Sequence, residues 1–486
     1  MPVTRVLTVV RSRRNSNDVL RAPLDGALDS PNARPPAGTV TGMHSVSTGV
    51  GEELFQLAAK LYPICRSITG EGVRRSLAII GEQLPLVVHE VPSGSAAYDW
   101  EVPLEWNIDD AAVFSPDGER VVDFQNHNLH VVSYSEPVAA TLSLKDLDQK
   151  LHSLPEHPEW IPYRTSYYRR AWGFCLRHDA RLGLRSGDYR VEIRSSLAPG
   201  SLTYGELAVP GRDRHEVLFF THTCHPSLAN DNAAGMAVTT ALAKWVASAP
   251  RRFSYRFVFA PGTIGSLCWL KANERSLGRI RAGLVLALLG DPGSLTYKMS
   301  RDGEAWTDSI ATYALSQIDA ASRVLPFSPY GYDERQLCSP GFNLPIGRLT
   351  RSANGGYPQY HSSADDLGLI RPVHLEESLA ACRMFVDVLE EDARYVNRSP
   401  KGEPRLGKRG LYGAVGGVTP AQREHAMLWV LNQSDGSKSL LDIARRSGVP
   451  FGVVREAASA LEAAGLLESE TRDKREMQRQ RKRGQR

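Results

Sequence analysis

The stretch EVLFFTHTCHPSLANDNAAGMAVTTALAKW, residues 216–245, decides how the rest of the chain is interpreted. Residues 217–221 form a short apolar run of the kind that a buried parallel strand needs. A polar loop follows, and from residue 233 onward apolar residues recur at helical spacing. The stretch therefore predicts a strand, a polar loop and a helix, as in open α/β sheets.

The polar loop has two interpretations. His222, His225 and Asp231 offer the imidazole and carboxylate groups that bind divalent metals. Ligands of α/β sheets also lie at the carboxyl ends of strands, where this loop falls. Alternatively, Asp231 or Asn230 caps the following helix, and the histidines are ordinary polar loop residues. The loop alone leaves both interpretations open.

Length and composition indicate a globular protein of two or three domains. The chain has 486 residues, of which 42% are hydrophobic and 23% are charged. No apolar run approaches the roughly 20 residues of a membrane helix, and the first residues lack the order of a signal peptide. Six scattered cysteines without a CxxC pair predict reduced, mostly buried thiols. We therefore expect a cytoplasmic protein without a membrane segment.

The basic residues are concentrated at the two ends of the chain. Residues 472–486 carry eight Lys/Arg and two Asp/Glu, and residues 1–48 carry six Arg and three Asp. The overall charge of +4 thus leaves −5 for the remaining body, which argues against a nucleic-acid-binding body. We interpret residues 1–48 as a disordered leader, unless the chain starts at Met43, and residues 471–486 as a basic tail.

Changes in pattern along the chain predict its domains. Residues 49–90 and 205–392 show helical periodicity and buried-strand runs, and are expected to form one α/β domain. Residues 91–204 contain short β-like runs separated by Pro, Gly and Asp, which predicts an inserted β-rich domain.

The C-terminal part has the outline of a winged-helix module. Residues 393–423 are rich in Gly, Pro and Arg and are expected to be a linker. Residues 424–470 contain three helical units, of which the second can be capped by Ser439. Winged helices often read DNA through the third helix. Here that helix shows one Arg and two Glu, so we expect packing or partner binding rather than DNA binding.

Further polar residues follow other strands of the expected sheet. Asp291 comes after the apolar run 283–289, and His361 lies in a polar loop after the short strand 344–349. Each alone is an ordinary turn or loop residue. If the strands are parallel, however, Asp291 and His361 meet the 222–231 loop at one sheet edge, and two His with two Asp form a zinc site.

Four long motifs resemble one known family. They are HTCHPSLANDNAAG (222–235), GDPGSLTYKMSRDG (290–303), PYGYDERQLCSPGFNLP (329–345) and YHSSADD (360–366). The chain is similar to the bacterial aminopeptidase-like proteins of the zinc exopeptidase superfamily over roughly residues 50–467. The resemblance implies a mixed sheet flanked by helices, with an inserted β-rich domain and a C-terminal winged helix.

The resemblance also implies a site. His225 or His222, Asp231, Asp291 and His361 would bind one or two Zn²⁺ ions. One position departs from the family pattern, since Gly262 stands where the Pro-Glu-Thr-Ile-Gly-Ser motif has its glutamate. Related aminopeptidases use glutamates in this region as general base and as ligand to a second metal.

Three consequences of Gly262 are open. The site holds one metal instead of two, another carboxylate acts as the general base, or the protein has no hydrolase activity. Asp333 and Glu334 in the segment GYDERQ are the nearest candidates for a replacement base. The same segment can also be a local ion pair on a solvated loop.

Several residues are candidates for substrate binding. Arg335 could hold a carboxylate through its planar fork, and Tyr332 and Tyr360 flank the candidate site residues in sequence. Arg66, in the turn LYPICRSITG, either holds a structural carboxylate or faces a substrate, and we expect the first.

The sequence thus predicts a zinc-dependent, aminopeptidase-like amide hydrolase that acts on a peptide or an amide-bearing small molecule. The alternative is a catalytically impaired, peptidase-like binding protein. A transcriptional regulator fits the acidic third helix poorly. A homo-oligomer is compatible with the sequence.

Overall fold

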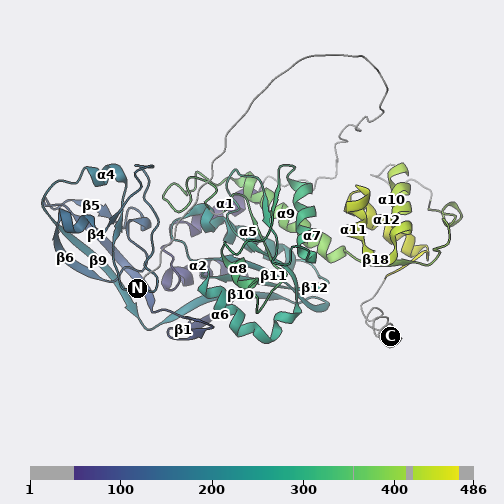
Figure 1. The fold of residues 1–486 in the computed structure, drawn as a ribbon, viewed down its shortest axis with the longest axis horizontal. Helices are drawn as coiled ribbons and strands as arrows, with labels where there is room; N and C mark the ends of the chain where they lie inside the picture. Colours follow the sequence, from purple (N-terminus) through teal and green to yellow (C-terminus); the bar gives the residue numbers. More distant parts are fainter. Residues whose placement is uncertain (1–48, 354, 412–419, 470–486) are drawn as a thin grey trace, which may run out of the picture. The chain divides into compact units, whose positions relative to one another are not determined.

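The computed structural model describes residues 49–353, 355–411 and 420–469, so the predicted leader and basic tail lie outside the described residues. An eight-stranded mixed sheet forms its centre (Figure 1). In spatial order the strands are β1 (Val87–Pro92), β10 (Ser201–Val209), β12 (Phe253–Ala260), β11 (Asp213–His222), β13 (Ile280–Leu286), β16 (Gly347–Thr350), β14 (Thr296–Lys298) and β15 (Arg323–Leu325). Strands β12, β11, β13 and β16 are parallel, whereas β10 and β14 run antiparallel to them. The predicted mixed α/β sheet is confirmed.

The middle strands are buried on both faces of the sheet. In β11, Val217 and Phe219 belong to one hydrophobic core, while Leu218 and Phe220 belong to another. This division follows because successive side chains of a strand point to opposite faces. Apolar burial on both sides explains why the strand is a continuous apolar run rather than an alternating one.

Helices cover both faces of the sheet (Figure 1). Helices α1 (Val50–Leu61), α5 (Gly235–Ala247), α7 (Trp306–Ile318) and α9 (Pro372–Glu391) contact one another and contribute to the first core, as does α2 (Glu71–Gly81). Helices α6 (Ile264–Asn273) and α8 (Asp333–Leu337) contribute to the second core. The carboxyl end of β11 therefore lies inside the protein, where His222 is only 2% exposed.

The part of the chain between β1 and β10 forms a second, antiparallel sheet. Its order is β5-β4-β9-β6, with β4 (Glu105–Phe114), β5 (Arg120–Asp123), β6 (Val138–Ser143) and β9 (Asp188–Ala198). The shorter elements around it are β2 (Ala96–Ala97), β3 (Trp100–Glu101), η1 (Asn128–His130), α3 (Leu144–Asp148), β7 (Leu151–His152), β8 (Phe174–Cys175) and α4 (His178–Leu182). The predicted insertion, residues 91–204, is too long at both ends. Its first two residues complete β1, and residues 201–204 begin β10 of the central sheet.

The C-terminal part folds as a winged helix, as expected. Helices α10 (Pro420–Gln433), α11 (Leu440–Ser447) and α12 (Phe451–Ala463) accompany a three-stranded sheet in the order β18-β17-β19. The capping role of Ser439 is confirmed, because its hydroxyl accepts a hydrogen bond from the Asp442 backbone N–H at the start of α11.

The predicted linker, residues 393–423, is wrong at its beginning. There β17 (Arg394–Asn397) pairs with both β18 (Asp435–Ser439) and β19 (Leu467–Ser469), so it belongs to the winged-helix sheet. Residues 412–419 of the expected linker lie outside the described residues.

The third helix of the winged helix packs on the α/β helices. The Phe451 backbone N–H at the start of α12 donates to the Tyr313 hydroxyl of α7 at 2.8 Å. Arg455 of α12 pairs with Glu391 at the end of α9, at 2.7 Å. The helix that reads DNA in many winged helices is therefore engaged within this chain.

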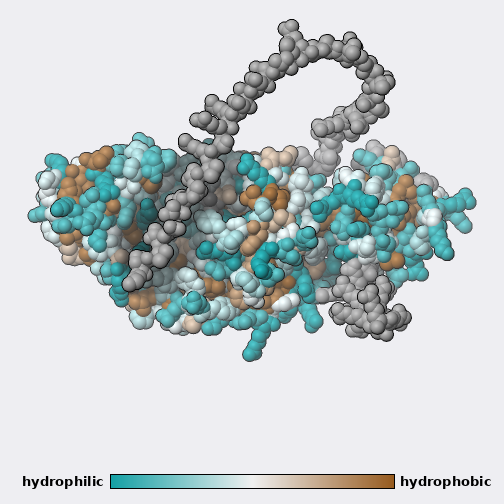
Figure 2. Space-filling view, viewed as in Figure 1, coloured by the Kyte–Doolittle hydropathy of each residue, from teal (hydrophilic) through white to brown (hydrophobic). Residues whose placement is uncertain are grey.

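The thiols and the surface agree with the composition. All six cysteines are unpaired, and five of them are buried. On the face seen in Figure 2, hydrophilic residues cover most of the described surface, with small hydrophobic areas between them. Within the described ranges, no helix is long and apolar enough to cross a membrane.

Candidate metal centre

The loop after β11 is buried and fixed by its two asparagines. The Asn232 side-chain amide donates to the Thr221 hydroxyl and to the His222 carbonyl, at 2.8 and 3.0 Å. The Asn230 amide donates to Asp291 Oδ2 at 2.9 Å, and its oxygen accepts from the Gly290 backbone N–H at 2.8 Å. These contacts tie the loop to β11 and to the segment after β13.

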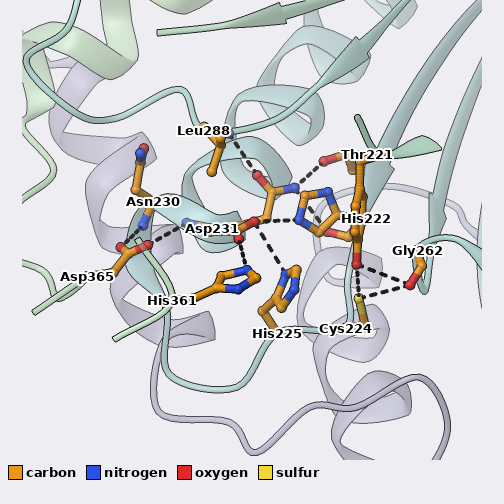
Figure 3. A network of polar contacts seen from close by, with 12 residues as sticks. Thr221, His222, Cys224, His225, Asn230, Asp231, Gly262, Leu288, His361 and Asp365 are labelled. Carbon is orange, nitrogen blue, oxygen red and sulfur yellow. Dashed lines mark hydrogen bonds and ion pairs between the residues drawn. The ribbon is translucent and has the colours of Figure 1, made fainter. Parts of the chain in front are cut away.

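Between the asparagines, Asp231 points at three histidines (Figure 3). Its Oδ1 lies 2.7 Å from Nε2 of His222 and 3.3 Å from Nδ1 of His225. Its Oδ2 lies 3.0 Å from Nε2 of His361. No side chain caps α5, so the interpretation of the loop as a capped helix is wrong.

His361 reaches this cluster from a separate segment of the chain. Its backbone has φ of +57°, in the left-handed region that non-glycine residues seldom adopt. The Tyr163 backbone N–H donates to the His361 carbonyl at 2.8 Å and holds that conformation. About a third of the His361 side chain is exposed, whereas His222, His225 and Asp231 are buried. His361 is therefore the member of the cluster closest to solvent.

The protonation states suit a metal. Burial lowers the pKa of His222 to about 4, although Asp231 opposes the shift. Burial also lowers the pKa of His225. Burial by itself would raise the pKa of Asp231, but the neighbouring histidines hold it well below its usual value. At neutral pH His222 and His225 are thus neutral and Asp231 is ionised, the forms that bind metals.

The donor set fits a divalent cation. One ligand atom from each of His222, His225 and Asp231 can be chosen so that all three lie within 4.8 Å of one another. His222 and His225 both lie against Oδ1 of Asp231, so both are candidate ligands. Imidazole and carboxylate donors of this kind suit zinc.

Asp291, by contrast, does not reach the histidines. Its Oδ1 accepts from the Ser352 hydroxyl at 2.6 Å and from the Gly293 backbone N–H at 2.8 Å. Its Oδ2 accepts from Asn230 at 2.9 Å. Asp291 therefore contacts Asn230, the neighbour of Asp231, and positions the loop through that hydrogen bond. Its place as a second carboxylate ligand stays a prediction.

Asp365 supports the centre from behind, which the sequence did not predict. Its carboxylate accepts from the backbone N–H groups of Asn230 and Asp231, at 2.6 and 3.2 Å, and from the Tyr357 hydroxyl at 3.0 Å. The adjacent Asp pair in YHSSADD was the available signal.

Tyr332 fills the space beside Gly262, where the resemblance led us to expect a glutamate. A Cβ atom added to Gly262 would lie 2.1 Å from Cε1 of the Tyr332 ring. The Tyr332 hydroxyl donates to the Gly262 carbonyl at 3.1 Å, and it lies 3.2 Å from Cys224 Sγ. The same ring lies 4.5 Å from the His222 ring, centroid to centroid. No side chain longer than that of glycine fits at position 262 while Tyr332 stays in place.

Asp333 and Glu334 have opposite environments. Glu334 is held by Lys298 at 2.8 Å, and the charges of Arg348 and Lys298 lower its pKa despite burial. Asp333 is fully buried, and neither of its oxygens forms a hydrogen bond of normal geometry within the described residues. Burial, with the charge of Glu334, raises the pKa of Asp333 to about 8. Of the two, Asp333 is the one whose pKa is raised.

Of the residues predicted to bind substrate, Tyr360 contacts the histidine cluster and Arg335 does not. Tyr360 stacks on His361 with ring centroids 3.9 Å apart. Arg335 is exposed, and no contact within the described ranges joins it to the cluster. Tyr163, from the inserted region, packs edge-on against His225 and His361 at 5.3 and 5.2 Å. Sequence analysis missed Tyr163, because nothing near it in the chain marks it.

Residues 55–392 match a family model described as a domain of unknown function (DUF4910), and residues 393–469 match a winged helix-turn-helix. The chain belongs to this DUF4910 family. Its two matched segments meet at the start of the winged-helix sheet, at β17.

The chain is similar to a Clostridium acetobutylicum protein named "Putative polysaccharide biosynthesis protein with aminopeptidase-like domain". It is 46% identical over 422 residues, covering 87% of this chain and 97% of its own length. A crystal structure of a "putative peptidase" from Clostridium acetobutylicum superposes with a TM-score of 0.83 at 45% identity, covering 87% of this chain and 97% of the other.

The family fold extends to known metalloenzymes. A zinc aminopeptidase from Bacillus subtilis superposes with a TM-score of 0.51 at 14% identity, over 69% of this chain and 93% of the other. At that identity the likeness shows the fold alone. The predicted aminopeptidase-like fold is confirmed, and the buried His222, His225 and Asp231 make zinc binding at this centre plausible.

Proposed function

We propose that the protein is a zinc-dependent, aminopeptidase-like hydrolase that cleaves an amide bond in a peptide or a small molecule. The observation that carries the proposal is the convergence of His222, His225 and His361 on the buried carboxylate of Asp231. These residues would hold one zinc ion. When bound, zinc would polarise a carbonyl group and lower the pKa of a water molecule.

The protein's own residues would supply the remaining functions. Asp333, whose pKa is raised to about 8 by burial, is our candidate for the group that accepts a proton at a carboxylate oxygen. The rings of Tyr163, Tyr332 and Tyr360 contact the histidines and would exclude water from one side of the substrate. Glu334 would serve to neutralise Lys298 rather than to move a proton.

A second candidate function is binding without efficient catalysis. It is favoured by Tyr332, which occupies the space of the family glutamate beside Gly262. A binding protein would retain the metal and the aromatic wall, but it would turn over no substrate.

Turnover of aminoacyl amides with added Zn²⁺ separates the two candidates. The hydrolase proposal expects measurable turnover by the wild type and none by His361→Ala. If neither protein turns over any aminoacyl amide while the wild type still binds zinc, the binding function is favoured. Absence of both zinc binding and turnover would remove the zinc proposal altogether.

For the winged helix we propose packing rather than DNA binding. Its third helix contacts Tyr313 and Glu391 of the α/β helices, and Glu456 and Glu462 lie on its exposed side. A gel-shift assay at low salt should show no salt-sensitive DNA complex. A specific, salt-sensitive complex would contradict this proposal.

A further inference from the structure

A buried cation lies in the turn between α1 and α2. Arg66 is 0% exposed, and its Nη1 donates a hydrogen bond to the Leu61 carbonyl. Its Nε and Nη2 have no hydrogen-bond partner among the described residues, and no carboxylate in that part of the chain pairs with it. The expectation that Arg66 holds a structural carboxylate is therefore wrong. Burying a guanidinium without a counter-ion is costly, so such a group needs another explanation.

Arg74, eight residues later, shows how this chain neutralises an arginine that serves structure. Its Nη1 and Nη2 donate to both oxygens of Glu105, at 2.8 and 2.7 Å, and its Nε donates to Glu90. Arg74 is also part-exposed, so its charge is both paired and solvated. Arg66 has neither a carboxylate partner nor solvent, although it is the more deeply buried of the two.

The turn of Arg66 adjoins the loop of the metal centre. The Asn128 side-chain amide donates to the Pro63 carbonyl at 3.0 Å and to the Ser227 hydroxyl at 2.7 Å, which joins turn and loop. Burial lowers the pKa of His225, and the nearby charge of Arg66 adds to that lowering. Arg66 therefore lies close to the imidazole that would hold the metal.

The two unpartnered nitrogens are the pair that recognises a carboxylate. Nε and Nη2 lie side by side on one edge of the guanidinium plane, and their N–H groups point in the same direction. This fork matches the two oxygens of a carboxylate and gives two parallel charge-assisted hydrogen bonds. A ligand carboxylate at this edge would supply the missing counter-ion.

We propose that Arg66 binds a carboxylate of the substrate through Nε and Nη2, beside the metal centre. This inference rests on the proposed hydrolase function and narrows its substrate to amides that also carry a carboxylate. One part of the substrate would be anchored by Arg66, which would fix the distance between its carboxylate and the amide placed at the histidine cluster.

The test compares two probes that differ only in charge. N-acetylglycine carries an amide and a carboxylate, and N-acetylglycinamide carries an amide in place of that carboxylate. Calorimetric titration of the full chain, with and without Zn²⁺, should show the acid binding at least about tenfold tighter than the amide. Arg66→Met should abolish that preference, and Arg66→Lys, which keeps the charge without the fork, should retain only part of it. The control Arg75→Met alters an exposed arginine of α2 and should keep the full preference.

A melting curve separates a binding role from a structural one. Because Arg66 is an unpaired buried charge, Arg66→Met without ligand should melt at or above the wild-type temperature. N-acetylglycine should raise the melting temperature of the wild type only. A lower melting temperature for Arg66→Met, together with equal binding of acid and amide by the wild type, overturns the proposal. Tighter, Arg66-dependent binding of inorganic phosphate overturns the assignment to a carboxylate.

These measurements do not depend on turnover. Arg66-dependent binding of the acid in a protein that hydrolyses no amide would leave the subsite standing and remove the hydrolase function. If hydrolysis depended neither on a carboxylate in the substrate nor on Arg66, the hydrolase function would stand and the carboxylate subsite would be removed.

Discussion

The two sides of the candidate metal centre are built differently. On the histidine side, Asp231 contacts three imidazoles and is held from behind by Asp365, so the donors are fixed before any metal arrives. On the opposite side, Gly262 carries no side chain, and the Tyr332 ring fills the space where the resemblance predicts a glutamate. One side presents a group of metal-binding donors, and the other has no carboxylate at position 262.

This difference teaches that holding a metal and moving a proton are separate properties of such a site. Ligand geometry depends on the loop after β11, whereas proton transfer depends on what faces it from the segments at Gly262 and Tyr332. A change on the second side can therefore leave the first intact. Variants on each side should have different signatures, and the following predictions use that difference.

The largest expected effect comes from the base side. Asp333→Asn removes the candidate proton acceptor without changing the shape of the side chain, so kcat should fall by about 10²–10⁴-fold. Because burial raises the pKa of Asp333 to about 8, wild-type kcat should rise as the pH increases through 8 and the carboxyl group loses its proton. A pH–rate profile checks this: the rise near pH 8 should be absent in Asp333→Asn.

Glu334→Gln is the matched control for that experiment. It should destabilise the protein by about 3–5 kcal/mol in denaturant unfolding, because it removes the buried carboxylate charge that pairs with Lys298 and Arg348. The rise in the pH–rate profile should persist but move to lower pH, because the charge of Glu334 helps to raise the pKa of Asp333. If the rise of kcat with pH disappeared in Glu334→Gln, Glu334 rather than Asp333 would be the base.

On the metal side, Asp291→Asn should have an intermediate effect. Asp291 acts through Asn230, so its loss should weaken zinc binding by roughly 10–100-fold, as is usual for residues that orient a ligand. Competition with a chromogenic chelator measures this affinity. Direct ligation by Asp291 would be indicated if the variant bound no zinc at all.

Replacing Gly262 tests whether Tyr332 excludes the family glutamate. Gly262→Glu alone should destabilise the protein by about 1–3 kcal/mol through overpacking against the ring, and it should gain no activity. In a Tyr332→Ala background that cost should largely disappear, and turnover should increase. An equal cost in both backgrounds would show that the ring is not the obstacle.

The smallest effect is expected at the aromatic wall. Tyr163→Ala removes edge-on ring contacts to His225 and His361, each worth about 0.5–1.5 kcal/mol beyond burial. KM should rise a few-fold, and zinc affinity should change by no more than a few-fold from that of the wild type. Tyr163→Phe, which keeps the ring and loses only the hydroxyl, should behave nearly as wild type in a steady-state assay.

The sequence was informative where a pattern is local. The apolar run before His222 predicted β11, and the order of polar loops predicted that Asp231 and His361 would meet, because parallel strands deliver their ends to one edge. Patterns did not reveal Tyr163, Asp365 or the Tyr332 ring at Gly262. Each of these acts through a contact between segments far apart in the chain, and such contacts depend on packing rather than on periodicity.

Sequence also misjudged residues whose role depends on their partners. Arg66 and Asp291 are of the right chemical type for pairing and for ligation. Only the three-dimensional surroundings show that Arg66 lacks a carboxylate partner and that Asp291 accepts hydrogen bonds from Ser352, Gly293 and Asn230.

Zinc titration of the metal-free full chain tests the central claim most directly. We predict that the wild type binds one zinc ion per chain, that Asp231→Asn loses far more affinity than the roughly 100-fold expected for an outer residue, and that the exposed control Asp117→Asn behaves as wild type. A wild type that binds no zinc, or an Asp231→Asn variant that binds it with unchanged affinity, would contradict the account.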